Sequence, residues 1–448
     1  MELGSTQSIL ILGTFAVVIA VIASDLLDIA VTALLGVCFL LVTGALDGHD
    51  LMTAMASGGE SLALLFGGMV VVRVLMPTGI FELAGYYFAR AVAGSGKRYL
   101  IGLILLIAPI CAFLPNATTV LLTAPIIIGL ARGLGVGFEV PVILCALVGN
   151  TAGILTLVGD PATYIVGSSI GLGFNGYLRH GTPGALLTLA AIVPVLPFVA
   201  RDIWHTQRAP EVGVARRPEI KRPWLVAVSL AVLALMIALF LVGPLLPVEV
   251  VPPAAAILCA TLALLLVNST HVEEVERVLA DLDWTTLVFL ACIFVLVAAT
   301  SKTGIFDGLS RMLYAQFGTE LPVVALAILL IVFAVSAFVA NIPLVLAMTF
   351  VVKGYFVVSS QMPELAAGAG FGAWPQWTYP AFIGLTFGAT LGGGATMVGD
   401  SSNIVACGIC NRAGGRVTFG RFLQVGLPIS LAQLVVAAAY VEAMRWIR

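Results

Sequence analysis

Residues 111–116 read Cys-Ala-Phe-Leu-Pro-Asn, and residues 336–341, which lie 225 positions later, read Ser-Ala-Phe-Val-Ala-Asn. The same offset separates Thr-Gly-Ile-Phe-Glu at 78–82 from Thr-Gly-Ile-Phe-Asp at 303–307. Two unrelated motifs that recur at one offset indicate an internal duplication. The fold is therefore expected to contain two copies of one unit.

A third pair of motifs lies in the later part of each copy. Val-Gly-Asp at 158–160 recurs at 398–400, which is an offset of 240. The extra residues of the second copy fall after Lys353, in a segment rich in Gly, Ala and aromatic residues. The duplicated units then run roughly from position 8 to 200 and from 223 to 444.

The composition predicts a membrane protein. Of the 448 residues, 60% are hydrophobic and only 10% are charged, whereas soluble domains carry about 25% charged residues. Apolar runs of about 20 residues satisfy their own backbone hydrogen bonds as helices inside a bilayer. The net charge of −2 argues against a nucleic-acid partner. We therefore predict an all-α polytopic membrane protein.

Residues that break helices interrupt several of the apolar segments. Pro115-Asn116 interrupts one, Gly159-Asp160-Pro161 a second, and Gly392-Gly393-Gly394 with Gly399-Asp400 a third. Such breaks expose backbone carbonyls and amides, which is tolerated at membrane depth only inside protein or around a watery cavity. In transporters, broken helices of this kind form the binding site.

These features predict three parts. They are a first inverted repeat at 1–200 with a helical pair at 99–131 and a broken helix at 139–170, a cytoplasmic linker at 201–222, and a second inverted repeat at 223–448 with a helical pair at 321–352 and a broken helix at 378–411.

The placement of lysine and arginine predicts the orientation. With the linker in the cytoplasm, most of the 21 cationic residues fall inside, both termini fall outside, and the two repeats have opposite topology. We expect a prokaryotic inner or plasma membrane. Arg73 lies near the end of its span, so we interpret it as snorkelling to the interface, with anion binding as the alternative.

Taken together, these motifs resemble the ion transporter superfamily, and most closely its arsenite-permease and melanosomal P-protein branch. The superfamily also contains NhaD-type sodium/proton antiporters and the divalent-anion/sodium symporters. The resemblance covers nearly the whole chain, and the paired order of the motifs is more specific than any one of them. The matching stretches are ESLALLFG at 60–67, AFLPNATTVLL at 112–122, Gly-Asp-Pro at 159–161 and SAFVANIP at 336–343.

The resemblance implies a scaffold domain and a transport domain that moves like an elevator, usually in a homodimer. The two helical pairs are then re-entrant hairpins whose tips are Asn116 and Asn341. The unwound segments of the broken helices are Gly159-Asp160 and Gly399-Asp400. Substrate and coupling ions meet between these tips and segments, and no cofactor is implied beyond Na+ or H+ as the coupling ion.

The residue types at these positions suit ion binding on chemical grounds alone, independently of the family resemblance. An asparagine amide offers both a donor and an acceptor, and freed carbonyls supply hard oxygen ligands. Half-helix N-termini favour an anion, whereas C-terminal ends and carbonyls favour a cation. We predict as substrate-binding residues Asn116, Thr118, Thr119, Asn341 and Asn403, and as ion-coupling residues Asn116, Gly159, Asp160, Asn341, Gly399 and Asp400.

Simpler interpretations stay open. An asparagine at a helix break can be only a cap, and each aspartate can cap a half-helix, a role that is compatible with ion coupling. Cys407 and Cys410 form a CxxC motif, for which metal or trivalent-arsenic capture is the alternative to packing. Because no second cysteine pair or nearby histidine accompanies it, we interpret the motif as packing and assign no metal site.

Two departures from the resembled families narrow the function. P-protein and antiporter members carry an aspartate immediately before each tip asparagine, where this chain has Pro115 and Ala340. This difference weakens the antiporter interpretation. The dicarboxylate symporters carry Ser-Asn-Thr at the tips, and this chain lacks both hydroxyls on each side, which argues against a dicarboxylate substrate.

We therefore predict a secondary active transporter of a small anion or weak-acid solute, of the arsenite, oxyanion or organic-anion class, coupled to H+ or Na+. A Na+/H+ antiporter of the same fold and a passive anion channel are the alternatives. An enzyme is not predicted, since the sequence has no HExxH motif and its four histidines are expected in loops outside the apolar spans.

Overall fold

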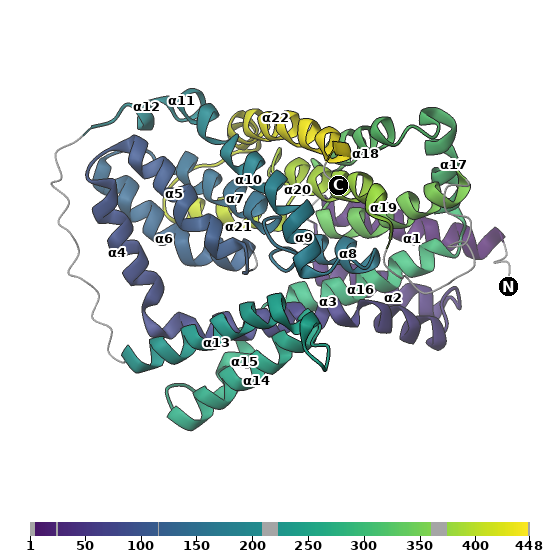
Figure 1. Cartoon of the computed structure of the whole chain (residues 1–448), viewed down its shortest axis with the longest axis horizontal. Coiled ribbons are helices and arrows are strands. Elements are labelled where there is room, and N and C mark those ends of the chain that lie inside the picture. Colours follow the sequence, from purple (N-terminus) through teal and green to yellow (C-terminus); the bar gives the residue numbers. More distant parts are fainter. Residues whose placement is uncertain (1–4, 24–25, 115, 208–222, 360–373, 447–448) are drawn as a thin grey trace.

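The computed structural model describes residues 5–23, 26–114, 116–207, 223–359 and 374–446, and the regular elements in these ranges are helices (Figure 1). Pro115, residues 208–222 of the predicted linker, and residues 360–373 of the segment that follows Lys353 lie outside the described residues.

The helices of the first half are α1 (Ser5–Ala23), α2 (Ile29–Val42), α3 (Gly48–Leu75), α4 (Ile80–Val92), α5 (Gly96–Cys111), α6 (Asn116–Leu134), α7 (Glu139–Gly153), α8 (Pro161–Ser169), α9 (Phe174–His180), α10 (Thr182–Ala190), α11 (Leu196–Val199) and α12 (Arg201–Trp204). Those of the second half are α13 (Pro223–Val242), α14 (Pro252–Thr270), α15 (Val275–Ala280), α16 (Trp284–Ser301), α17 (Ile305–Phe317), α18 (Leu321–Ser336), α19 (Asn341–Val358), α20 (Tyr379–Gly393), α21 (Ser401–Arg412) and α22 (Phe419–Ala443).

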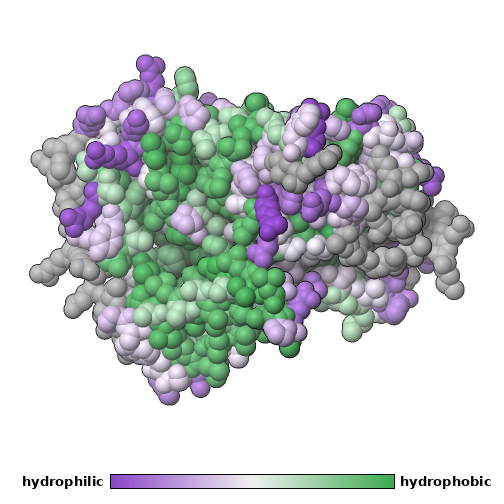
Figure 2. Space-filling view, viewed as in Figure 1, coloured by the Kyte–Doolittle hydropathy of each residue, from purple (hydrophilic) through white to green (hydrophobic). Residues whose placement is uncertain are grey.

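Many of these helical stretches are long and apolar enough to cross a bilayer. Figure 2 shows apolar side chains over the lower part of the view, where α13 and α14 lie. The all-helical, multi-pass membrane fold that we predicted is confirmed. Within the described residues, the eight candidate spans are Gly48–Thr78, Asn116–Leu134, Thr182–Val199, Pro223–Leu245, Pro252–Thr270, Trp284–Ser301, Asn341–Val358 and Phe419–Trp446.

The helix bounds repeat with the offsets found in the motifs. Helices α17 and α18 begin and end 225 positions after α4 and α5, and α19 begins 225 positions after α6. Helix α20 begins and ends 240 positions after α7, and α21 begins 240 positions after α8. Sequence duplication has therefore produced duplicated secondary structure down to the single residue at most helix ends.

One hydrogen bond fixes each helical pair against the broken helix of its own repeat. The Thr156 hydroxyl donates to the carbonyl oxygen of Ala112, and Thr396 donates to that of Ala337 at the equivalent place. The turn of each helical pair thus lies against the break of its broken helix, in both halves.

The two broken helices begin in the most buried part of the fold. Every residue of α20 is buried, and so is every residue of α7 after its first. Helix α20 packs on α18 through Gly384, Gly388 and Gly392, where an added Cβ would meet backbone oxygens of α18 at 3.0, 2.7 and 2.3 Å. Such close backbone approach is typical of small residues spaced four apart in membrane helices.

Arg73 is paired with two carboxylates, and its predicted snorkelling to the interface stays a prediction. Its guanidinium lies 2.7 Å from Glu273 and 2.6 Å from Asp281, and its side chain is only 13% exposed. Both carboxylates come from the segment that links α14 to α16, about 200 positions away in sequence. The arginine therefore joins the end of α3 to this segment, and pairing replaces solvation of its charge.

Candidate functional site

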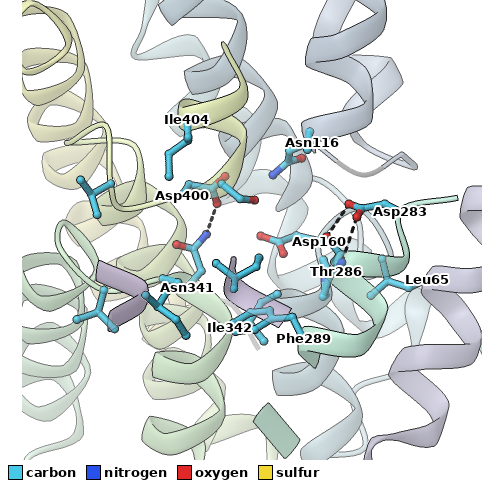
Figure 3. A pocket seen from close by; sticks show the side chains of 18 of the residues that line it. Leu65, Asn116, Asp160, Asp283, Thr286, Phe289, Asn341, Ile342, Asp400 and Ile404 are labelled. Atoms are coloured by element: carbon cyan, nitrogen blue, oxygen red, sulfur yellow. Dashed lines mark hydrogen bonds between the residues drawn. The ribbon is translucent and has the colours of Figure 1, made fainter. Parts of the chain in front are cut away.

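The two hairpin tips and the two helix breaks meet around one cavity (Figure 3). Its volume is about 130 Å³, which is room for a few water molecules or a small solute. Asn116, Asn341, Gly159, Asp160 and Asp400 line it. Five of the predicted site residues, widely separated in sequence, are thus brought together.

Both aspartates cap the half-helix that follows them. One oxygen of Asp160 accepts from the amide of Ala162 at 3.0 Å, and one oxygen of Asp400 accepts from the amide of Ser402 at 2.8 Å. The capping interpretation therefore describes the geometry of both residues. It leaves the second oxygen of each carboxylate for another partner.

In the second half, that other partner is the tip asparagine. Asn341 is the first residue of α19, and its amide donates to the second oxygen of Asp400 at 2.7 Å. Its own side-chain oxygen lies 3.3 Å from the Ser336 hydroxyl, whose nearer acceptor is the carbonyl oxygen of Ala389 at 2.6 Å. Asn341 therefore bonds across to the helix break and makes no capping bond to its own helix.

The first half is arranged differently. The amide of Asn116 donates to Asn150 at 3.2 Å and not to Asp160. The side-chain oxygen of Asn116 and the second carboxylate oxygen of Asp160 are buried and accept no hydrogen bond from any described residue. Buried acceptors without donors are costly unless a ligand completes them. Two residues that line the cavity in the first half thus each hold one buried oxygen atom without a described donor.

Asn150 and Ser402 connect the two halves, and sequence reasoning missed both. The Asn150 side-chain oxygen lies 2.8 Å from the Ser402 hydroxyl, and its amide lies 3.4 Å from the side-chain oxygen of Asn403. All three residues are at most 1% exposed. A polar residue within the apolar run 139–158 was the available signal for Asn150.

The other predicted residues do not line the cavity. Thr119 is buried beside the thiol of Cys111, and Thr118 is half-buried on the same helix. Asn403 donates at 2.9 Å to the carbonyl of Gly393, the last residue of α20, and to that of Thr396 in the following break, so it holds the helix break together. Their predicted roles in substrate binding stay predictions.

Gly399, the residue before Asp400, lies where the backbone of the helix break approaches that of the hairpin turn. An added Cβ there would meet the carbonyl oxygens of Gly393 and Ser336 at 2.6 and 2.7 Å. At Gly159 the corresponding carbonyls, of Gly153 and Cys111, would lie at 2.6 and 3.0 Å, and that of Ala112 would lie at 2.8 Å. Glycine at both positions lets the hairpin turn contact the break directly.

The opposite wall of the cavity is largely apolar and comes from α1, α2, α3 and α16. Its charged group is Asp283, which caps α16 and accepts from the amide and hydroxyl of Thr286 at 3.1 and 2.6 Å. Asp283 points toward the side of the cavity that holds Asp160 (Figure 3). Sequence reasoning missed this carboxylate, because nothing local distinguishes it from an ordinary helix cap.

The electrostatics of the cavity combine two opposite features. Helices α6, α8, α19 and α21 all direct their N-termini to it, and each helix N-terminus carries about half a positive charge. The described lining residues include Asp160, Asp283 and Asp400, and no lysine or arginine. The arrangement can therefore attract an anion through helix ends and a cation through carboxylates.

An all-helical membrane fold with two hairpin tips and two helix breaks around a polar cavity defines the class of this protein as a membrane transporter. Comparisons with known proteins agree, since residues 17–371 match the family described as CitMHS, citrate transporter. The chain belongs to this family of transporters.

Relatives support the same class and the resemblance seen in the sequence. An uncharacterized transporter of Synechocystis is 40% identical and matches over 96% of each chain. An uncharacterized transporter of Mycobacterium tuberculosis is 31% identical over 99% of each chain. The human P protein is 26% identical over 85% of this chain and 53% of its own length.

A solved structure supports the fold. The YdaH transporter of Alcanivorax borkumensis aligns with a TM-score of 0.57 over 89% of this chain and 86% of its own, at 12% identity. That transporter is described as having an unusual topology. The predicted membership of the ion transporter superfamily is confirmed, and the chain is a transporter and not an enzyme.

Proposed function

We propose that this chain is a secondary active transporter of a small anion or weak-acid solute, coupled to Na+ or H+. One observation carries the proposal: four helix N-termini and two capping aspartates meet at a single cavity. The helix ends favour a negatively charged solute. The carboxylates of Asp160 and Asp400 would repel that solute unless a cation accompanies it, so binding of the two is coupled.

Citrate is the first solute to test, because it is the substrate in the name of the family. A tricarboxylate brings more negative charge to a cavity that already holds three aspartates among its lining residues. Its transport therefore requires neutralising cations more strongly than transport of a weak acid such as arsenite does. The dependence of flux on cations is expected to rise with the charge of the solute.

A Na+/H+ antiporter is the second candidate. The observation that favours it is the same lining, which has three carboxylates and no lysine or arginine among the described residues. Such a lining suits cations alone. The absence of an aspartate at Ala340, just before the second tip, reduces the number of cation ligands and speaks for the first candidate.

The test is flux into proteoliposomes with an imposed sodium or proton gradient and a panel of citrate, succinate, sulfate, arsenite, silicate and chloride. Solute uptake that rises with one gradient and disappears in Asp160→Asn supports the proposal. Asp307→Asn is the matched control, because Asp307 is an exposed carboxylate on α17 away from the cavity. Sodium-driven proton movement without solute flux would establish the antiporter instead.

We extend the proposal to an elevator movement of a transport domain in a homodimer, with the linker cytoplasmic. The contact between Tyr164 of α8 and Glu60 of α3, 3.2 Å long, joins the proposed moving and static parts. A cysteine pair at these two positions, in a chain freed of native cysteines, is expected to block flux when cross-linked. Full flux through the cross-linked protein would contradict the movement.

A further inference from the structure

The two half-sites are joined by a short chain of buried side chains. We propose that the Ser402 hydroxyl and the Asn150 amide form a relay through which the occupation of Asp400 alters the bonding of Asn116. The relay rests on the proposed function only in treating Asp400 as a place where a coupling cation binds. Its members were not among the residues predicted from sequence.

The orientation of the Asn150 amide is fixed by its neighbours. Both amide hydrogens of Asn403 are used by backbone carbonyls, each at 2.9 Å, so the Asn403 oxygen must accept. The Asn150 nitrogen therefore faces Asn403 at 3.4 Å. As a consequence, the Asn150 oxygen faces the two donors that remain, the amide of Asn116 at 3.2 Å and the hydroxyl of Ser402 at 2.8 Å.

Ser402 is the element with two states. Its hydroxyl oxygen lies 2.7 Å from a carboxylate oxygen of Asp400 and 2.8 Å from the Asn150 oxygen. A hydroxyl has one hydrogen and can donate to only one of them. A free carboxylate is the stronger acceptor, because hydrogen bonds to ionised groups are about twice as strong as neutral ones.

The position of the Ser402 hydroxyl hydrogen decides whether the buried Asn150 oxygen needs the amide of Asn116 as its hydrogen-bond donor. While Asp400 is a free carboxylate, Ser402 donates to it, and Asn116 is the one described donor left for the buried Asn150 oxygen. When a cation occupies Asp400, the Ser402 hydroxyl turns and donates to the Asn150 oxygen. The Asn150 oxygen then no longer depends on the amide of Asn116 as its donor. The Asn116 side chain is then free to turn toward Asp160.

The first half has no equivalent relay from Asp160 toward the second half, because the residues at the repeat positions of Ser402 and Asn150 differ. The offset of 240 places Ala162 where the second half has Ser402, and Thr390 where the first half has Asn150. Ala162 donates its backbone amide to Asp160 just as Ser402 does to Asp400. Alanine is therefore compatible with this half-helix start, and Ser402→Ala is expected to fold.

The experiment needs neither solute nor gradient. The quantity measured is the change in melting temperature that Asn116→Ala causes in the purified full-length protein in detergent. This change is measured in four backgrounds: wild type, Asp400→Asn, Ser402→Ala, and Asp400→Asn combined with Ser402→Ala. Asn116→Ala is expected to lower the melting temperature by about 2 °C more when residue 400 is the carboxylate. Ser402→Ala should abolish that difference, because Asn116 is then the remaining donor in either case.

Thr386→Val serves as the matched control for loss of a buried hydroxyl, since Thr386 donates only to Phe382 of its own helix at 3.1 Å. In this background the difference should persist. If Asp400→Asn yields no folded protein, Asp400→Ser takes its place, because it removes the charge and keeps a capping oxygen.

Equal effects of Asn116→Ala at either charge of residue 400 would overturn the relay. A difference that survives Ser402→Ala would also overturn it, because the coupling would then run by another route. Citrate flux in wild type decides the proposed function separately. A relay without flux would leave the coupling intact and refute the proposed function for that solute.

Discussion

Gly399→Ala tests whether the close contact between hairpin turn and helix break supports the site. The new Cβ would lie 2.6 Å from the carbonyl oxygen of Gly393 and 2.7 Å from that of Ser336, whereas ordinary contact begins at 3.4 Å. Both obstacles are backbone atoms, so two segments must separate by about 0.7 Å, a degree of overpacking that costs about 1–3 kcal/mol. Because both obstacles are backbone and Gly399 directly precedes the cavity residue Asp400, we expect the upper value and loss of flux.

The assay is the melting temperature in detergent, with flux measured in parallel. A cost of about 3 kcal/mol corresponds to a decrease of about 3 °C in a chain of this size. Gly408→Ala is the control, because Gly408 lies inside α21 with nothing within 4 Å of an added Cβ. There alanine should be neutral or stabilising by about 0.5–1 kcal/mol. Equal melting temperatures for the two variants, with flux retained, would refute the packing argument.

Three further predictions concern individual hydrogen bonds and ion pairs. Asp160→Asn should abolish cation-stimulated flux with little change in melting temperature, because the side-chain oxygen of an asparagine can still accept the hydrogen bond from the single described donor. Asp400→Asn should abolish this flux and also lower the melting temperature, since the Asp400 carboxylate accepts from three described donors. Arg73→Ala should cost about 2–3 kcal/mol because it leaves two carboxylates without their partner, whereas Arg445→Ala, in an exposed pair, should cost less than about 1 kcal/mol by thermal melting. Tyr164→Phe should cost about 1 kcal/mol by the same measurement, through loss of its bond to a carboxylate of α3, and an unchanged melting temperature would show that this bond carries no stability.

Sequence reasoning found what the two copies share. The duplication marked the motifs around Asn116, Asn341, Asp160 and Asp400, because each motif occurs twice at a fixed offset, and the family resemblance identified the two asparagines as hairpin tips. The same reasoning could not find residues in which the copies differ. Asn150 has no asparagine at its repeat position, so nothing in the duplication marked it.

Ion pairs between residues far apart in the chain could also not be predicted from the sequence. The carboxylates that neutralise Arg73 lie about 200 positions away, and Glu273 is one of several acidic residues in its segment. Only the packing of α3 against α14 and α15 selects it. An intramembrane charge therefore predicts that a partner exists, but the identity of that partner depends on the tertiary fold.

The difference between the halves bears on the order of ion binding. In the second half, a cation at Asp400 must compete with the amide of Asn341 and the hydroxyl of Ser402, both already bonded to the carboxylate. In the first half, the side-chain oxygen of Asn116 and the second carboxylate oxygen of Asp160 accept nothing from the described residues. Displacing a made hydrogen bond costs more than completing an unmade one. On the proposal that both carboxylates bind a coupling cation, we therefore predict that the residues that differ between the copies make Asp160 the first of the two to be occupied.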